Sequence, residues 1–369
     1  MVQPRLPLYA GGNVSAIVPA LLGPQGTRVI PAWMPAPVEA ARSVVLLVVD
    51  GLGWHQLQAH KKFLPTLSSM AGGSITTVAP TTTVTALTSI TTGLAPGEHG
   101  MMGYRMDMGR QVVQMLRWAD DKGDLRTSYP PEIVQPTPPF MGSAIPVVSK
   151  AEFDSTAFTA AHLRGTRSFG WRAASSIAVT VGSLLRAGHQ FVYAYYDGVD
   201  KIAHERGFGD FYEAELRTVD RLIGDIAEQL TPDSVLLVTA DHGQVHVGDN
   251  TIVPHPDVVA GVSYQSGEGR FRWLHAKGGA TEDVLAAAKS HYADVAWIVS
   301  RDEAIDGGWF GPRVTDAARK RLGDVALLPF TDTSFEDAGD TGPFQLVCRH
   351  GSLTEAEVDV PLLAFRSNA

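Results

Sequence analysis

The side chains best suited to chemistry are acids and histidines that follow strongly apolar stretches of the chain. Three such stretches, 43–49, 190–196 and 235–240, lead into Asp50, into Asp197 and Asp200, and into Asp241 and His242. Continuous apolar runs of this length predict strands buried on both faces of a parallel sheet. The carboxyl ends of parallel strands meet at one sheet edge, where α/β proteins bind ligands. Carboxylates and imidazoles gathered there could hold divalent metal ions.

Asp200 and His204 are four residues apart. On a helical turn they would share one face, and this spacing suits two ligands of one metal ion. The same spacing is equally typical of a surface ion pair. Asp197 is an alternative to Asp200, although its seven-residue offset from His204 is a less direct fit. A further histidine, His350, precedes Gly351 near the end of the chain.

A threonine-rich segment, residues 78–93, contains seven threonines and one serine. Pro80 discourages a continuing strand, and Gly93 is typical of a helix end, so the pattern predicts a helix over residues 83–92. A hydroxyl at the start of a helix lies beside free backbone N–H groups that favour an anion, phosphate above all. The residues 81–83 could also serve only as helix caps.

The composition limits the classes of function. The chain has 369 residues and a net charge of −9, which provides no general attraction to nucleic acid. The single cysteine, Cys348, excludes an intrachain disulfide, and the apolar runs are too short to cross a membrane. We therefore expect a soluble, cytoplasmic protein whose phosphate-binding charge comes from metal ions.

The elements that must position these residues form an α/β fold. We predict a mostly parallel central sheet with helices on both faces, built from residues 1–244 and 345–369. Helices are expected at 54–72, 172–187 and 211–230, and further strands at 74–78 and 360–365. Residues 245–344 mix short strand-like pieces with a helix near 281–292, which predicts a small inserted α+β subdomain.

Taken together, these motifs resemble the alkaline phosphatase superfamily, and most closely its nucleotide pyrophosphatase/phosphodiesterase branch. The resemblance rests on Asp50-Gly51, Thr83 at a helix start, Asp200-x-x-x-His204, Asp241-His242-Gly243 and His350-Gly351. It implies an alkaline phosphatase-like fold and two divalent ions, zinc first, with manganese or iron as alternatives. One ion would be bound by Asp200, His204 and His350. The other would be bound by Asp50, Asp241 and His242, with the Thr83 oxygen as a further ligand.

The resemblance also implies that Thr83 is the nucleophile. Thr83 lies sixteen residues before His99, which is the spacing the branch shows between its nucleophile and this histidine. Thr81 and Thr82 remain alternatives, because the motif around them matches only in part. The branch often places an asparagine on the transferred phosphate, where this chain has Tyr104. A phenol can donate one hydrogen bond but is bulkier, so Tyr104 is the expected substrate-binding residue.

The predicted activity is hydrolysis of a phosphodiester or a nucleotide pyrophosphate in a small phosphorylated substrate, a nucleotide being one candidate. The alternatives are a phosphomonoesterase or a phosphonoacetate-type hydrolase on the same two-metal scaffold. A phosphomutase is a weaker alternative, because it usually carries a serine nucleophile. A binding protein without catalytic activity is the remaining alternative. No nucleic-acid or membrane partner is expected, and the sequence does not indicate the oligomeric state.

Overall fold

A computed structural model describes residues 2–23, 28–340 and 345–367. Its centre is a seven-stranded sheet in the order β2-β19-β10-β1-β9-β7-β8. The strands are β1 (Ser43–Val49), β2 (Ala71–Thr76), β7 (Pro146–Val148), β8 (Arg167–Ser168), β9 (Phe191–Tyr196), β10 (Ser234–Thr239) and β19 (Asp359–Arg366). The five strands from β10 to β8 are parallel to one another, and β19 runs antiparallel to both β10 and β2. This confirms the predicted mostly parallel sheet.

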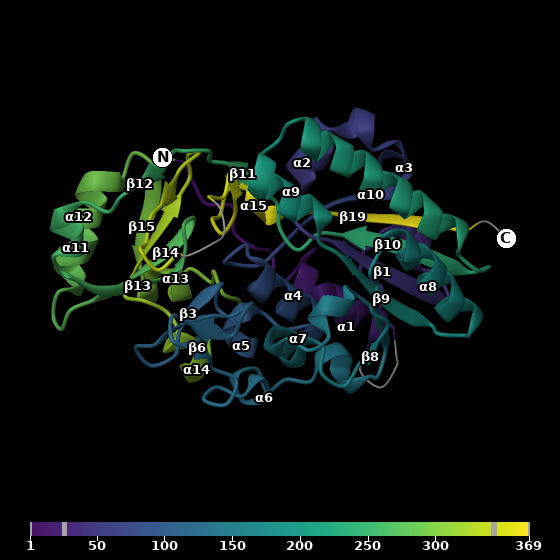
Figure 1. The fold of residues 1–369 in the computed structure, drawn as a ribbon, viewed down its shortest axis with the longest axis horizontal. Helices are drawn as coiled ribbons and strands as arrows, with labels where there is room; N and C mark the ends of the chain where they lie inside the picture. The colour runs from purple at the N-terminus through teal and green to yellow at the C-terminus, as the bar shows by residue number, and fades with distance from the viewer. Residues whose placement is uncertain (1, 24–27, 341–344, 368–369) are drawn as a thin grey trace.

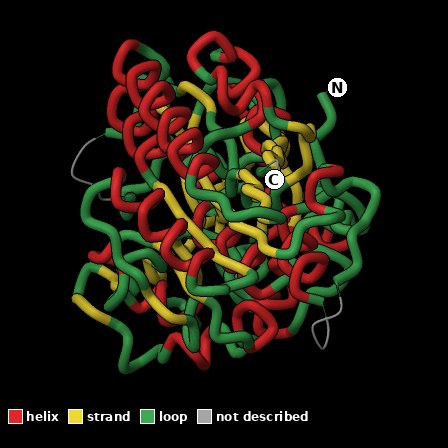
Figure 2. Tube along the Cα trace, turned by 90° about the vertical axis from the view of Figure 1, so that its right-hand side faces the viewer, coloured by secondary structure: helices red, strands yellow, loops and turns green. Residues whose placement is uncertain are grey.

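Helices cover both faces of this sheet, as expected (Figure 1). One face carries α2 (Trp54–Ala59), α3 (Pro65–Ser69), α8 (Ser175–Arg186), α9 (Gly198–Arg206) and α10 (Asp210–Glu228). The other carries α1 (Ile17–Leu22), α4 (Thr83–Thr92) and α7 (Ala157–His162). Figure 2 shows the strands in yellow running between the red helical layers. The buried faces explain why β1, β9 and β10 are apolar throughout rather than alternating.

The helix predicted over residues 54–72 is wrong in its extent. It is two short helices, α2 and α3, joined by a 3₁₀ turn at Lys61–Phe63, and β2 already begins at Ala71. Pro65 occupies the first position of α3, where its missing N–H costs nothing, but the same residue prevents one continuous helix. The chain therefore reverses into β2 earlier than the apolar pattern indicated.

Residues 262–329 form a second, antiparallel sheet in the order β13-β14-β16-β15. It consists of β13 (Val262–Glu268), β14 (Phe271–Ala276), β15 (Ala296–Ser300) and β16 (Val325–Pro329), with α11 (Pro256–Val259), α12 (Thr281–Tyr292), α13 (Arg301–Asp306) and α14 (Asp316–Arg319). One face packs on α12 around Leu274, Val284 and Leu327. The other contributes Phe271 and Trp273 to the main core.

The two ends of this inserted segment are joined at its base. The strand β11 (Val245–His246) pairs antiparallel with β18 (Cys348–Arg349), and β12 (Thr251–Ile252) pairs with β17 (Ser334–Phe335). The boundaries at 244 and 345 stay predictions; residues 341–344 and 368–369, which belong to the two predicted units, lie outside the described residues.

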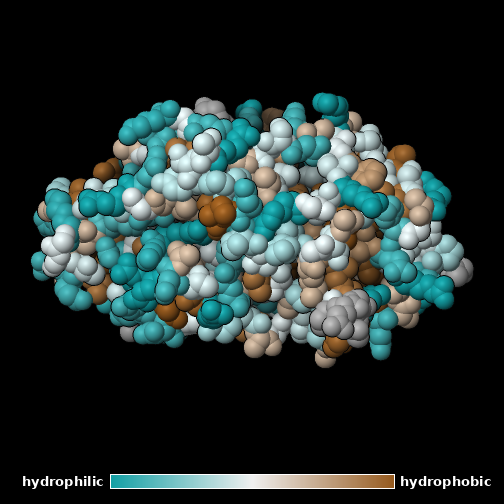
Figure 3. Space-filling view, turned by 90° about the horizontal axis from the view of Figure 1, so that it is seen from below, coloured by the Kyte–Doolittle hydropathy of each residue, from teal (hydrophilic) through white to brown (hydrophobic). Residues whose placement is uncertain are grey.

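A further small sheet, β3 (Arg105–Asp107), β4 (Val112–Gln114), β5 (Ala119–Asp120) and β6 (Gly123–Asp124), flanks the insertion. It is connected to the main sheet through α6 (Pro131–Val134) and follows the short helix α5 (Pro96–His99). On the face shown in Figure 3, hydrophobic residues lie in small groups among hydrophilic ones. Across the described ranges, no helix has the length and apolar character needed to cross a membrane.

Candidate active site

The predicted acids meet at the carboxyl ends of the three central strands. Asp50 directly follows β1, and Asp241 and His242 follow β10 after one residue. Asp200 lies in the first turn of α9, which begins just after β9. The strand register aligns Val49 with Tyr196, so the loops that follow β1 and β9 start side by side. The sheet therefore brings together residues that are up to 191 positions apart, from Asp50 to Asp241.

Asp50, Asp241 and His242 form the first cluster, in which one potential ligand atom of each lies within 4.8 Å of the others. The Nε2 atom of His242 is 3.5 Å from Asp50 Oδ1 and 3.5 Å from Asp241 Oδ2. All three side chains are buried. Among the described residues, Asp50 Oδ1 and Asp241 Oδ2 have no hydrogen-bond partner. Buried carboxylate oxygens without donors are costly, and a cation would satisfy them.

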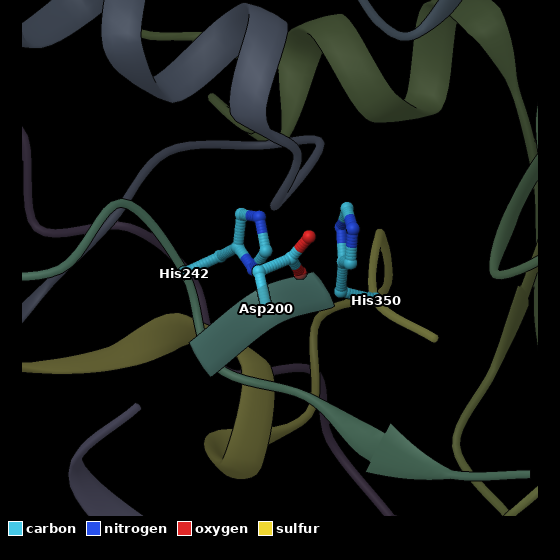
Figure 4. Close-up of side chains that lie close together, drawn as sticks. All are labelled: Asp200, His242 and His350. Carbon is cyan, nitrogen blue, oxygen red and sulfur yellow. The ribbon is translucent and has the colours of Figure 1, made fainter. Parts of the chain in front are cut away.

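The second cluster lies around Asp200 and His350, and the ring of His204 lies beside them, with its centroid 5.1 Å from that of His350. His204 Nε2 lies 3.2 Å from Asp200 Oδ1, so the pair is oriented into the site rather than exposed as a surface ion pair. Potential ligand atoms of Asp200, His242 and His350 also lie within 4.8 Å of one another. Figure 4 shows the Asp200 carboxylate directed toward the side on which the two imidazole rings lie. Five of the six predicted acid and histidine ligands thus belong to two groups that share His242, and His204 adjoins them through Asp200.

Each of the three histidines is held by a backbone carbonyl on its Nδ1 atom. The acceptors are Cys348 O for His204 at 2.6 Å, Gly243 O for His242 at 3.0 Å and Thr81 O for His350 at 2.8 Å. Because a carbonyl can only accept, Nδ1 carries the proton and Nε2 keeps its lone pair. A second partner of this kind is typical of metal-binding histidines.

The rings of His242 and His350 are stacked, with centroids 3.7 Å apart and planes at 18°. A ring-nitrogen lone pair lies in the plane of its ring, and two nearly parallel planes at this separation do not meet near the rings, so the two Nε2 atoms cannot both point at one ion. Each ring could instead serve a separate ion, as in sites that hold two metals. The ring stacking therefore fits two ions better than one.

The pKa shifts of the acids and histidines in the clusters also indicate a cation site. Burial raises the pKa of Asp50 well above its usual range, and the charges of Asp241 and Asp200 raise it further. Burial also raises the pKa of Asp200 and of Asp241. The pKa values of His242 and His350 are lowered, again mainly by burial. Neutral imidazoles beside closely spaced carboxylates form a set of ligands that suits divalent cations.

Thr83 is the first residue of α4, and its Oγ1 lies 3.2 Å from His242 Nε2. The N-cap residue Thr82 makes no capping hydrogen bond through its side chain. The N–H groups of the first turn are thus left for another acceptor. Thr81, by contrast, is fully buried and donates from Oγ1 to Ser352 O at 3.0 Å. Of the three threonines considered, Thr83 is the one that faces the clusters.

Several other sequence candidates occupy different roles. Asp197 pairs with Lys150 and Lys201, which leaves Asp200 to the cluster. His99 is buried and bonded to Ser89 Oγ at 2.8 Å, so it supports the loop rather than the clusters. Tyr104 is half-buried and lies outside the residues that line the cavity beside Thr83. Its role in binding substrate stays a prediction.

Two supporting residues were not found from the sequence. Tyr195 donates its hydroxyl proton to Asp50 Oδ2, and Gln244 Nε2 donates to Asp200 Oδ1 at 2.9 Å. Gln244 directly follows Asp241-His242-Gly243, so its position in the motif was a usable signal. Tyr195 had no such signal, because it reads as one more apolar residue of a buried strand.

A cavity of about 260 Å³ opens beside the clusters, and Asp50, Thr83 and Asp200 lie in its wall. Most of the remaining wall is apolar or aromatic, and includes Leu87, Leu116, Phe153, Phe158, Leu163, Tyr193 and Tyr195. Leu116 and the lining residues between 149 and 163 belong to the segment between β3 and β8, which supplies much of the cavity wall. An organic group next to Thr83 would find a largely apolar surface here.

The sheet order, the antiparallel strand β19 and the acids at the strand ends match the alkaline phosphatase-like fold that the motifs predicted. The sequence pattern of the type I phosphodiesterase/nucleotide pyrophosphatase family matches residues 44–353. The chain belongs to this family, and hence to the phosphoester hydrolases. The resemblance inferred from the motifs is confirmed.

Several solved structures share this fold. Murine ectonucleotide pyrophosphatase/phosphodiesterase 5 is 14% identical over 88% of each chain, with a TM-score of 0.63. An inactive variant of it in complex with AMP gives a TM-score of 0.64. Phosphonoacetate hydrolase from Sinorhizobium meliloti 1021 is 16% identical over 89% of this chain and 91% of its own, with a TM-score of 0.62. At these identities the likeness concerns the fold. No curated protein matches the chain by sequence.

Proposed function

We propose that this protein is a two-metal phosphodiesterase or nucleotide pyrophosphatase with Thr83 as its nucleophile. The observation that carries the proposal is the contact between Thr83 and His242 at the start of α4. It puts a hydroxyl at a helix N-terminus, against one metal-ligand cluster and in the wall of the cavity. A substrate phosphorus held in this part of the cavity would lie within reach of both the Thr83 hydroxyl and the metal-ligand cluster.

The residues of the chain support a two-step hydrolysis. Thr83 Oγ1 forms a bond to phosphorus while the bond to the leaving oxygen breaks, and water then cleaves the Thr83 ester. The free N–H groups of the first α4 turn donate to the non-bridging oxygens, whose charge grows in the transition state. A threonine hydroxyl is a poor nucleophile by itself. When bound by the two clusters, divalent ions would lower the pKa of that hydroxyl and neutralise charge on the phosphoryl group.

Mixed carboxylate and imidazole ligands favour zinc, with manganese or iron as alternatives. We assign Asp50, Asp241, His242 and the Thr83 oxygen to one ion, and Asp200, His204 and His350 to the other. This division agrees with the nearly parallel rings of His242 and His350, which suit separate ions.

The nearby cationic side chains are already paired with acids, and this favours a diester substrate over a monoester. Within the described part of the chain, Lys201 is the one lysine or arginine in the cavity wall, and it is paired with Asp197. Arg105 is held by Asp337 and Asp340. A phosphomonoester brings nearly two negative charges at neutral pH, and phosphonoacetate adds a carboxylate. A diester brings one charge and a second organic group, which the apolar wall can receive.

The test compares aryl phosphate monoesters and diesters with the same leaving group. The protein is freed of metal with a chelator and then assayed with added Zn²⁺ or Mn²⁺. We expect no turnover after chelation, and restored turnover that strongly prefers the diester. A preference for the monoester would assign a phosphatase instead. Turnover of neither ester, with both ions bound, would direct the search to phosphonates and mutase substrates.

A further inference from the structure

The loop that carries His350 is anchored by a buried ion pair with the inserted sheet. Arg270 forms the turn between β13 and β14, and Glu357 lies in the short helix α15 (Glu355–Val358). In Figure 1, α15 lies between the inserted sheet and the central sheet. Both side chains are fully buried, with no exposed area.

This pair is bidentate and completely bonded. Arg270 Nε and Nη2 donate to Glu357 Oε1 and Oε2 at 2.7 and 2.8 Å. The remaining guanidinium protons go to the carbonyls of Pro329, Thr331 and Thr333 at 3.1, 2.8 and 2.6 Å. All five donors of Arg270 are thus used. A buried ion pair is weak evidence for stability, because desolvation offsets much of the attraction. The contribution of this ion pair is therefore better judged by the groups that it holds in place.

Glu357 is bonded to the loops of both metal-ligand clusters. Its Oε1 accepts from Ser352 N at 3.0 Å, two residues after His350. Its backbone carbonyl accepts from Gly243 N at 2.9 Å, one residue after His242. A carboxylate that is itself fixed by Arg270 can hold the Ser352 amide in one place.

Thr81 continues the connection from Ser352 to the ring of His350. Its Oγ1 donates to Ser352 O at 3.0 Å and accepts from Gly351 N at 2.9 Å. Its carbonyl then accepts the Nδ1 proton of His350 at 2.8 Å. Four consecutive contacts therefore lead from Arg270 through Glu357, Ser352 and Thr81 to His350. The same Thr81 lies two residues before Thr83.

We infer that Arg270 and Glu357 are positioning residues that orient His350 toward its metal ion from within the inserted sheet. The inference rests on the proposed function, because it requires His350 to bind an ion. Groups that orient metal ligands through a hydrogen bond typically change metal affinity or activity by 10 to 100-fold when altered. The insertion thereby contributes to the metal centre as well as to the surface around it.

The variant Arg270→Lys keeps the charge but loses the planar bidentate geometry. Zinc binding is measured on the full-length protein by equilibrium dialysis and elemental analysis across buffered free Zn²⁺ concentrations. We expect the weaker of two zinc sites to require about 10 to 100-fold more free Zn²⁺. Turnover of a diester should return toward the wild-type value once that zinc is supplied. A second variant, Thr81→Val, removes the hydroxyl without removing volume and should shift the same site.

Arg272→Lys is the matched control. Arg272 lies on β14, is also fully buried and pairs with Asp340, but its described contacts do not include the 350–357 loop. It should lower the melting temperature without changing zinc affinity. Unchanged zinc affinity in both Arg270→Lys and Thr81→Val would overturn the inference, as would an equal shift in Arg272→Lys. Wild-type protein that binds no zinc would instead overturn the proposed function.

Discussion

The imidazole rings of His242 and His350 lie face to face, 3.7 Å apart and inclined by 18°, although 108 residues separate them in the chain. Each Nδ1 is held by a backbone carbonyl, so the two Nε2 lone pairs are directed by the fold. Two donors that lie in separate, nearly parallel planes match a pair of ions better than a single one.

The first prediction concerns metal content. Wild-type protein saturated with zinc should bind two ions per chain, and His350→Ala should retain one, because the cluster of Asp50, Asp241 and His242 is left intact. Elemental analysis after dialysis against buffered Zn²⁺ measures this directly. A single ion in both proteins would contradict the division of the ligands.

The second prediction identifies the nucleophile. Thr83→Ala should lower kcat about 1,000-fold or more, as expected when a covalent nucleophile is removed. Thr83→Ser should retain part of the turnover, since a hydroxyl remains. The matched control is Thr91→Ala, on the same helix, where the hydroxyl bonds only backbone carbonyls of its own helix. Near-normal turnover in Thr83→Ala with normal zinc content would exclude Thr83.

The third prediction concerns the apolar cavity. Leu116→Trp should narrow it and raise KM for bis(4-nitrophenyl) phosphate by about 10-fold. The smaller methyl 4-nitrophenyl phosphate, which has the same leaving group, should be affected much less. Ile133→Trp, at an exposed residue outside the cavity wall, is the control. Equal effects on the two esters would show that the cavity does not receive the organic group.

The fourth prediction is a pH dependence of stability. Burial, aided by the charge of Arg321, lowers the pKa of His99 to about 3, against about 6.5 in an unfolded chain. Between these values the unfolded chain binds a proton that the folded chain does not. The free energy of unfolding should therefore fall as the pH falls from about 6.5, by up to about 1.4 kcal/mol per pH unit from this group.

His99→Gln should remove this contribution, so its free energy of unfolding should vary less steeply with pH. Urea unfolding of both metal-free proteins between pH 6 and pH 4 provides the comparison, since chelation removes the pH dependence of metal binding. Parallel pH profiles for the two proteins would mean that His99 takes up its proton in the folded state.

Most of the central sheet could be predicted because its strands are continuous apolar runs, whose burial is a local property of the sequence. The end of α4 at Gly93 was equally readable, since a left-handed glycine closes the helix. The extent of the helix after β1 was misjudged, because the start of β2 depends on pairing with β19, more than 280 residues later. Such pairing leaves no local signal.

Within the candidate site, residue types, motif order and the family resemblance pointed to Asp50, Asp241, His204, His242 and His350, and left Asp197 as an alternative to Asp200. An acid or histidine after a buried strand must lie at the sheet edge, because the strand direction determines where its end falls. The choice of Asp200 over Asp197 required the structure, since it depends on Lys150 and Lys201 pairing with Asp197.

The sequence by itself determined the fold class, the family and the set of acids and histidines at the sheet edge. Tertiary structure decided which way each side chain points: the stacking of His242 on His350, the orientation of Thr83 and the anchoring of the His350 loop by Arg270 and Glu357. The physical reason is that strands and helices follow from local periodicity and caps. Ring orientation and buried ion pairs depend on hydrogen bonds between segments that meet only after the chain has folded.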